Sequence, residues 1–222
     1  PPLTVLLALL PSWIAFAWLA SRASWFWNHR PDLNFGWVVL MLCGYLLWEA
    51  SEKRPALQCR WRLPWVVLAI VGLGLVFLVQ IYQAAFGMNA ASLAGLAIAI
   101  MSLIAANLGY VFGGKGLRQF GFAFGFILIA LPMPSAVHNL VVGGLQSKVT
   151  FLNVEILNLI GIPAQQMGSV IRLPTCTVGV DEACSGIRSL QSTLMATLFI
   201  GYIALSRTGF RIVLVFVGVL LA

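Results

Sequence analysis

Residues 64–86 read PWVVLAIVGLGLVFLVQIYQAAF, an apolar run without a single charged side chain. This length matches the roughly 20 residues that a helix needs to cross the hydrocarbon core of a bilayer. The rest of the chain has the same character: 61% of its 222 residues are hydrophobic, 9% are charged, and the mean hydropathy is +0.98. A soluble domain could not keep this much apolar surface out of water. The sequence therefore predicts a membrane protein with several spans.

Further apolar segments surround this run, and short connectors rich in glycine, proline and charge separate them. The second and fifth segments are short for a crossing, so tilt or local thinning of the bilayer is expected there. No connector has room for a separate soluble domain. The predicted fold is an all-α polytopic transmembrane helical bundle, a single domain over residues 1–222 with about seven visible spans. The expected spans are 3–20, 36–50, 64–86, 91–112, 118–132, 187–206 and a seventh that starts near 211.

The chain is basic, with thirteen Lys and Arg residues against six Asp and Glu residues and a net charge of +7. No basic stripe interleaved with aromatic residues is present, and cytoplasmic loops of membrane proteins are basic in any case, so no nucleic-acid partner is expected. Placing three connectors in the cytoplasm puts eight of the thirteen basic residues inside. Segment 133–186 then lies on the periplasmic or extracellular face of the cell (inner) membrane. The eight are Lys53, Arg54, Arg60, Arg62, Lys115, Arg118, Arg207 and Arg211.

Segment 133–186 differs from the spans around it. From Leu145 onward, polar side chains fill most faces, and apolar residues recur at helical spacing at Val149, Leu152, Ile156 and Leu159. This pattern predicts an outer-face amphipathic helix that lies in the membrane interface or joins the bundle as a further partner. Residues 169–173 and 175–180 flank Pro174 and predict two short extended pieces. Together they form a hairpin lid that leads the chain to Cys184.

Residues 180–190 read VDEACSGIRSL and concentrate polar chemistry at the start of an apolar span. Cys184 precedes the predicted helix by about one turn, where backbone N–H groups and the helix dipole favour a thiolate. Arg188 lies one turn further on and adds positive charge. Ser185 and Gly186 allow a substrate carbonyl to approach free N–H donors, as in an oxyanion hole. Asp181 and Glu182 oppose the thiolate if they face it, and an inert buried thiol is the common alternative.

The cysteines and histidines predict no metal site. The four cysteines show no C-x-x-C spacing, and His29 lies far from His138 in the sequence, so a structural zinc site is not expected. The proposed chemistry also requires no cofactor. Cys176 and Cys184 both lie in the segment predicted to face the outside. In an oxidising compartment, the alternative for these two cysteines is a disulfide bond. A disulfide would consume the nucleophile, so the two interpretations exclude each other in the active state.

The stretch Glu182-Ala-Cys-Ser-Gly-Ile-Arg-Ser189 resembles the signature of the exosortase/archaeosortase family, E-A-C-S-G followed by an apolar residue, Arg and Ser. Weaker similarities extend from about residue 25 onward, at 32–37, 45–48, 131–134, 161–163 and Gly168. The resemblance implies a multi-pass membrane cysteine protease or transpeptidase that works on the outer face. Cys184 then matches the family's nucleophile and would form an acyl-thioester. The supporting motif residues are Glu182, Ser185, Gly186 and Arg188.

The resemblance also implies a substrate class. Members of the family recognise exported proteins by a C-terminal sorting signal, which consists of a short motif such as Pro-Glu-Pro, a transmembrane helix and a basic tail. They cleave near the short motif and transfer the new carboxyl end to another acceptor. Membrane lipid is the other expected partner. The sequence does not indicate the acceptor.

The match is incomplete at the C-terminus. The family also has an arginine in an Asn-x-x-Arg motif at the outer end of the next span, followed by a later basic residue, usually His. This chain ends at Ala222 before these would appear, so a truncated C-terminus is expected. Arg207 and Arg211 do not fill the gap, because the charge pattern puts them on the cytoplasmic side. Two alternatives stay open: a non-catalytic membrane transporter or scaffold, and a degenerate member that binds sorting signals without cleaving them.

Overall fold

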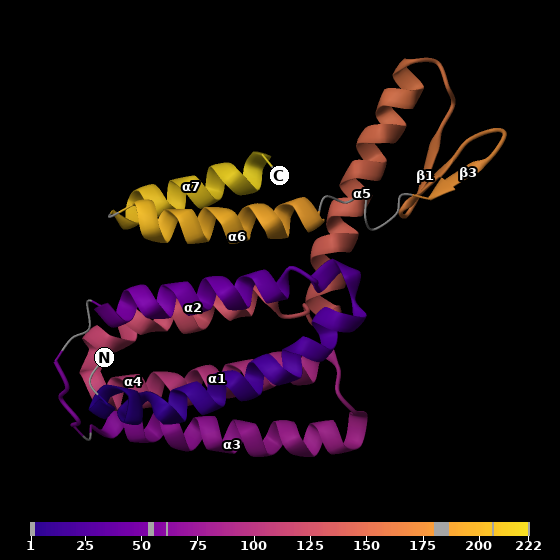
Figure 1. The fold of residues 1–222 in the computed structure, drawn as a ribbon. Coiled ribbons are helices and arrows are strands. Elements are labelled where there is room, and N and C mark those ends of the chain that lie inside the picture. The colour runs from indigo at the N-terminus through magenta and orange to yellow at the C-terminus, as the bar shows by residue number, and fades with distance from the viewer. Residues whose placement is uncertain (1–2, 53–55, 61, 180–186, 206, 222) are drawn as a thin grey trace. The chain divides into compact units, whose positions relative to one another are not determined.

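Seven α-helices and a three-stranded β-sheet make up the described part of the chain. The computed structural model describes residues 3–52, 56–60, 62–179, 187–205 and 207–221, shown as a ribbon in Figure 1. Four of its helical segments are long and apolar enough to cross a bilayer: Pro31–Glu52, Leu63–Phe86, Ala90–Ala130 and Ser135–Leu159. The prediction of an all-α membrane helical bundle is therefore confirmed. The helices are α1 (Leu3–His29), α2 (Gly36–Glu52), α3 (Leu63–Phe86), α4 (Ala90–Gly125), α5 (Ser135–Leu159), α6 (Ile187–Ala204) and α7 (Thr208–Leu221).

The chain divides into two compact units, Pro1–Met133 and Pro134–Ala222. The first contains α1 to α4 and two short 3-10 helices, η1 (Pro31–Leu33) and η2 (Phe126–Ala130). The second contains α5, the strands β1 (Gln165–Met167), β2 (Val170–Arg172) and β3 (Thr177–Gly179), and then α6 and α7. The boundary falls within a Pro-Met-Pro sequence, where proline removes backbone donors and limits helix continuation. The single domain over residues 1–222 stays a prediction.

Helix α4 is the centre of the first unit, because it contacts α1, α2 and α3. Apolar residues at helical spacing line its first half and are buried, namely Leu93, Leu96, Ile100, Ile104 and Leu108. Helix α3 is different, since Gly72 is its only buried residue among those described. A long helix with an exposed apolar surface fits a hydrocarbon surrounding rather than water.

The two expected spans 91–112 and 118–132 are two helical pieces of α4, and a sharp kink at Gly113 separates them. Gly113 has a φ of +70°, which glycine adopts more readily than any other residue. The break takes the carbonyl groups of the preceding turn out of the helical ladder. Val111 accepts from the backbone N–H of Gln58 at 2.9 Å, and Tyr110 accepts from that of Arg60 at 3.1 Å. The basic connector before α3 therefore lies against the kink beside Lys115, so two of the connectors predicted to be cytoplasmic share one end of the first unit.

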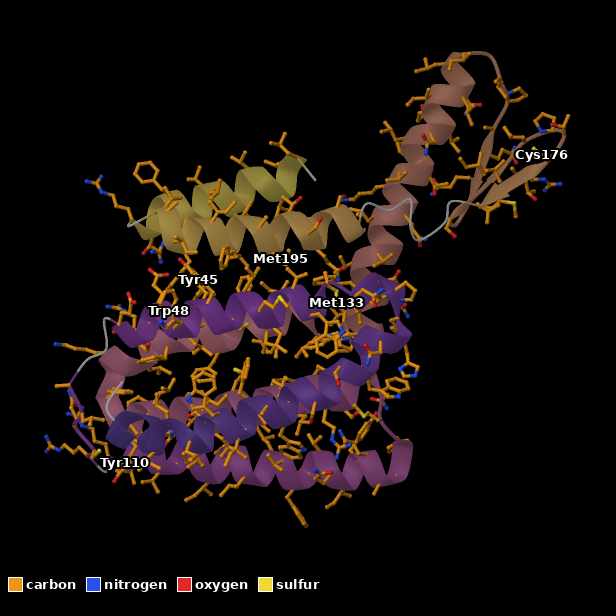
Figure 2. All side chains as sticks on the ribbon, in the orientation of Figure 1. Tyr45, Trp48, Tyr110, Met133, Cys176 and Met195 are labelled. Atoms are coloured by element: carbon orange, nitrogen blue, oxygen red, sulfur yellow. The ribbon has the colours of Figure 1, made fainter. Side chains whose placement is uncertain are left out.

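Trp27 packs at the end of this unit opposite to the kink. Figure 2 labels Tyr110 near the kink and Met133 near the opposite end. The Trp27 indole is fully buried, and its Nε1 donates to the carbonyl oxygen of Ala130 at 2.8 Å. The ring packs edge-to-face with Trp37, with centroids 5.4 Å apart. A Cβ on Gly36 would lie 2.4 Å from atoms of the same ring. Trp27 thus joins α1, α2 and η2, and it lies between two stretches that carry the family resemblance, 32–37 and 131–134.

In the second unit, α5 carries the sheet on one face. Val154 forms a buried cluster with Ala164 and Ile171, against which Leu157 and Leu173 pack. The predicted apolar stripe lies about half a turn away from Val154. Its members Leu152, Ile156 and Leu159 are 60%, 45% and 85% exposed. The helix is therefore confirmed, although it begins earlier than Leu145, and the stripe that predicted it is not the face that packs within the unit.

The two last expected spans form α6 and α7, which pack side by side as an antiparallel pair (Figure 1). Close approach depends on small residues, because a Cβ on Gly218 would lie 2.6 Å from the methyl group of Thr197. Arg211 stabilises the end of α6: its Nε donates to the carbonyl oxygen of Leu205 at 2.7 Å and its Nη2 to that of Tyr202 at 3.1 Å. Cations at a helix C-terminus are favourable. Arg211 thus has a structural role at this turn.

Candidate active site

The predicted nucleophile Cys184 and its neighbours Glu182, Ser185 and Gly186 lie outside the described residues, as does Asp181. Arg188 belongs to the first turn of α6, and its side chain is also outside the described part. Their predicted roles stay predictions. What the structure does describe is the segment that leads to them, from the C-terminal half of α5 through β3.

A β-hairpin leads the chain to a point five residues before Cys184. Strands β2 and β3 pair antiparallel, with Arg172 opposite Thr177. Across their turn, the N–H of Leu173 donates to the carbonyl oxygen of Cys176 at 2.8 Å. This confirms the two extended pieces predicted around Pro174. Sequence reasoning missed β1, which pairs with β2 through the two-residue turn Gly168–Ser169. A glycine that begins such a turn was the available signal.

Helix α5 ends in a turn that sets the position of the sheet. Gly161 has a φ of +89°, its N–H donates to the carbonyl oxygen of Asn158, and the N–H of Ile162 donates to that of Leu157. This pair of bonds around a left-handed glycine is the Schellman motif. The Asn158 amide then holds Ala164 at both main-chain groups, accepting from its N–H at 2.9 Å and donating to its oxygen at 3.2 Å. The strand therefore starts from a fixed point beside the helix.

A cavity of about 420 Å³ lies between the end of α5 and the sheet. Its lining combines polar groups with rigid apolar walls. Arg172 and Gln165 both line it, and they are direct partners across β1 and β2. The remaining lining residues are Asn158, Pro163, Ala164, Leu173 and Pro174.

Cys176 is an exposed free thiol at the turn of the hairpin, labelled in Figure 2. The Thr175 hydroxyl lies 4.0 Å from its sulfur. Its partner in the alternative disulfide, Cys184, is outside the described residues, so the choice between nucleophile and disulfide stays a prediction. Cys59 is also exposed, in the connector before α3, whereas Cys43 is buried in α2.

The other titratable residues singled out from the sequence are not gathered at the cavity. The Nδ1 of His29 lies 2.8 Å from the carbonyl oxygen of Trp25, and its ring stacks on that indole with centroids 4.6 Å apart. His138 is half-buried near the start of α5. Lys148 and Glu155 are exposed on the same helix. None of these four lines the cavity.

Comparison with known proteins gives a single result. No curated protein and no solved structure matches the chain. The family model described as transmembrane exosortase matches residues 27–222, which is most of the sequence and includes the whole cysteine motif. This chain therefore belongs to the transmembrane exosortase family.

Proposed function

We propose that this protein is a membrane-embedded cysteine protease or transpeptidase that cleaves the C-terminal sorting signal of exported proteins. The observation that carries the proposal is the stretch Glu182-Ala-Cys-Ser-Gly-Ile-Arg-Ser189, which lies within the residues that match the family. A cysteine is the only side chain of this stretch that forms an acyl-enzyme readily near neutral pH, because a thiol is a stronger nucleophile than a hydroxyl.

The reaction proceeds by covalent acyl transfer. The Cys184 thiolate attacks the scissile carbonyl carbon of the substrate, a C–S bond forms, and the C–N bond breaks. The leaving amine takes up a proton and departs with the transmembrane tail. An amine or a water molecule then attacks the thioester carbonyl carbon and the C–S bond breaks. The acyl group leaves as an amide or as a carboxylate, and a proton given up by the attacking group restores the thiol. Backbone N–H groups near Gly186 stabilise the oxyanion in both steps, and the Arg188 cation favours the thiolate.

The described hairpin supports a surface position for this site. The outer edges of β1 and β3 pair with no described strand, and unpaired backbone groups cannot be satisfied in hydrocarbon. The exposed stripe of Leu152, Ile156 and Leu159 is suited to lipid instead. We place the C-terminal half of α5 at the membrane interface, with the stripe toward lipid and the sheet toward water. Five residues of chain then reach about 18 Å at most, which keeps Cys184 near the sheet.

The function is tested by trapping the acyl-enzyme. The protein is co-expressed with a tagged reporter that carries Pro-Glu-Pro, a transmembrane helix and a basic tail, and membranes are quenched in acid. We expect an adduct with the mass of the protein plus the N-terminal part of the reporter, which neutral hydroxylamine removes because it cleaves thioesters. A member that only binds the signal would give no adduct while still co-purifying with the uncleaved reporter, and that result would overturn the proposal.

The membrane side of the hairpin is tested with the two exposed thiols. Single-cysteine variants retain either Cys176 or Cys59, and the remaining cysteines are replaced by alanine. In right-side-out membrane vesicles, a membrane-impermeant maleimide is expected to label the Cys176 variant and to leave the Cys59 variant unlabelled, since the basic connectors stay in the cytoplasm.

Detergent permeabilisation is the matched control, because both thiols are exposed and both variants should then react. Labelling of the Cys59 variant in sealed vesicles, together with protection of the Cys176 variant, would reverse the orientation. Such a result would place the hairpin in the cytoplasm, away from exported substrates.

A further inference from the structure

We propose that the cavity beside Arg172 binds an acidic side chain of an extended peptide and so selects the substrate. That the peptide is a substrate rests on the proposed function. The binding site itself rests only on the described residues of the second unit.

The first step is the chemistry of the cavity. Its volume of about 420 Å³ accommodates a few side chains, and its walls include the rigid rings of Pro163 and Pro174 and the apolar side chain of Leu173. Arg172 is the only cation among the described residues that line the cavity, and Gln165 stands directly opposite it on β1. Asn158 uses its amide on both main-chain groups of Ala164 and therefore contributes to the wall rather than to a ligand.

The second step is the charge of the ligand. The Arg172 side chain is exposed, and its guanidinium group makes no ion pair or hydrogen bond with any residue in the part of the chain that the structure describes. A guanidinium group is charged at all relevant pH values, and its planar fork of N–H donors matches a carboxylate in two parallel hydrogen bonds. No acidic residue is found among the described residues that line the cavity. The ligand that completes it is an anion of carboxylate geometry.

The third step is the form of the ligand. Strand β1 starts at the cavity wall, and no described strand pairs with its outer edge. An extended peptide can add to such an edge through main-chain hydrogen bonds while alternate side chains enter adjacent pockets. Proline walls also suit an extended main chain. A lipid headgroup would use the guanidinium alone, so the combined features favour a peptide.

The experiment measures the affinity of the purified full chain for three peptides in detergent. The Cys184→Ala background prevents turnover. The peptides carry a neutral fluorophore and read Ser-Val-Thr-Ala-X-Ala-Thr-Val-Ser, where X is Glu, Gln or Lys. We expect the Glu peptide to bind about tenfold more tightly than the Gln peptide, because a charge-assisted hydrogen bond to the guanidinium is lost. Arg172→Gln should remove this preference, and Arg172→Glu should transfer it to the Lys peptide.

Lys148→Gln is the matched control, since it removes an exposed cation of the same unit that does not line the cavity. It should leave the tenfold preference intact. Equal affinity of the parent chain for all three peptides, or a preference that survives Arg172→Gln, would overturn the proposal. A third result would also overturn it: the parent chain binds anionic phosphatidylglycerol vesicles but shows no peptide preference, and Arg172→Gln loses the vesicle binding. The anion bound by Arg172 would then be a lipid phosphate.

The two proposals fail separately. A Glu preference that depends on Arg172, in a protein that forms no hydroxylamine-sensitive adduct, would retain this site and reject the protease. Processing of the reporter without any peptide preference would retain the protease and reject this site.

Discussion

Cys184→Ala is expected to lower the rate of reporter processing by at least about a thousandfold, because removal of a covalent nucleophile leaves only binding and oxyanion stabilisation. The measurement is the rate at which the shortened reporter appears in membranes, with the amount of protein held equal. Cys184→Ser is an informative second variant. Its hydroxyl is a poor nucleophile without a dedicated base, so its rate should also remain far below that of the parent.

Cys176→Ala is the control, because Cys176 lies in the same segment and is an exposed free thiol at the hairpin turn. If Cys184 is the nucleophile, Cys176→Ala should keep its rate within about twofold of the parent, as expected for a surface substitution. Equal loss of processing in both single variants would identify a structural disulfide instead. Full processing by Cys184→Ala would exclude the acyl-thioester altogether.

Trp27→Ala is expected to produce the largest loss of stability in the first unit. It removes a fully buried indole and leaves the carbonyl oxygen of Ala130 without its hydrogen-bond donor. Truncation of a buried aromatic side chain costs about 3–5 kcal/mol. Thermal unfolding in detergent micelles should show a Tm lower by many degrees. Trp25→Ala is the control, because Trp25 is 49% exposed and its change should have a much smaller effect.

A pair of glycines tests the same contact from the side of α2. Gly36→Ala would place a Cβ 2.4 Å from the Trp27 ring, whereas Gly44→Ala on the same helix meets no atom within 4 Å. Both changes gain the helix propensity of alanine, which is worth up to about 1 kcal/mol. Overpacking costs about 1–3 kcal/mol, so only Gly36→Ala should lower the Tm. Equal Tm shifts in the two variants would show that the indole does not require the glycine.

Much of the fold follows from the sequence because hydrophobicity acts locally along a membrane chain. A run such as 64–86 has few options other than a helix, since in hydrocarbon each backbone group must find a partner within its own segment. Glycine and proline then mark the ends. The kink at Gly113 and the boundary at Pro134 both fall at breaks that the sequence indicates. The hairpin around Pro174 follows from the same kind of local signal.

The packing of α5 could not be read from its periodicity. The stripe of Leu152, Ile156 and Leu159 is the strongest apolar pattern on the helix, yet the sheet packs on the face of Val154. In water the strongest stripe would be buried against protein. Beside a bilayer, lipid can cover that stripe, and the weaker face remains for protein.

By itself the sequence determined the class of this protein: a membrane chain of apolar helices with basic connectors, and a cysteine-bearing stretch within the residues that match its family. These are local properties, set by the hydrophobicity and chemistry of consecutive residues. Only the tertiary structure brought Trp27 to Ala130 and Gln165 opposite Arg172. Contacts between residues distant in sequence depend on where the chain reverses and on the register of its strands. No single segment of the sequence encodes these two properties.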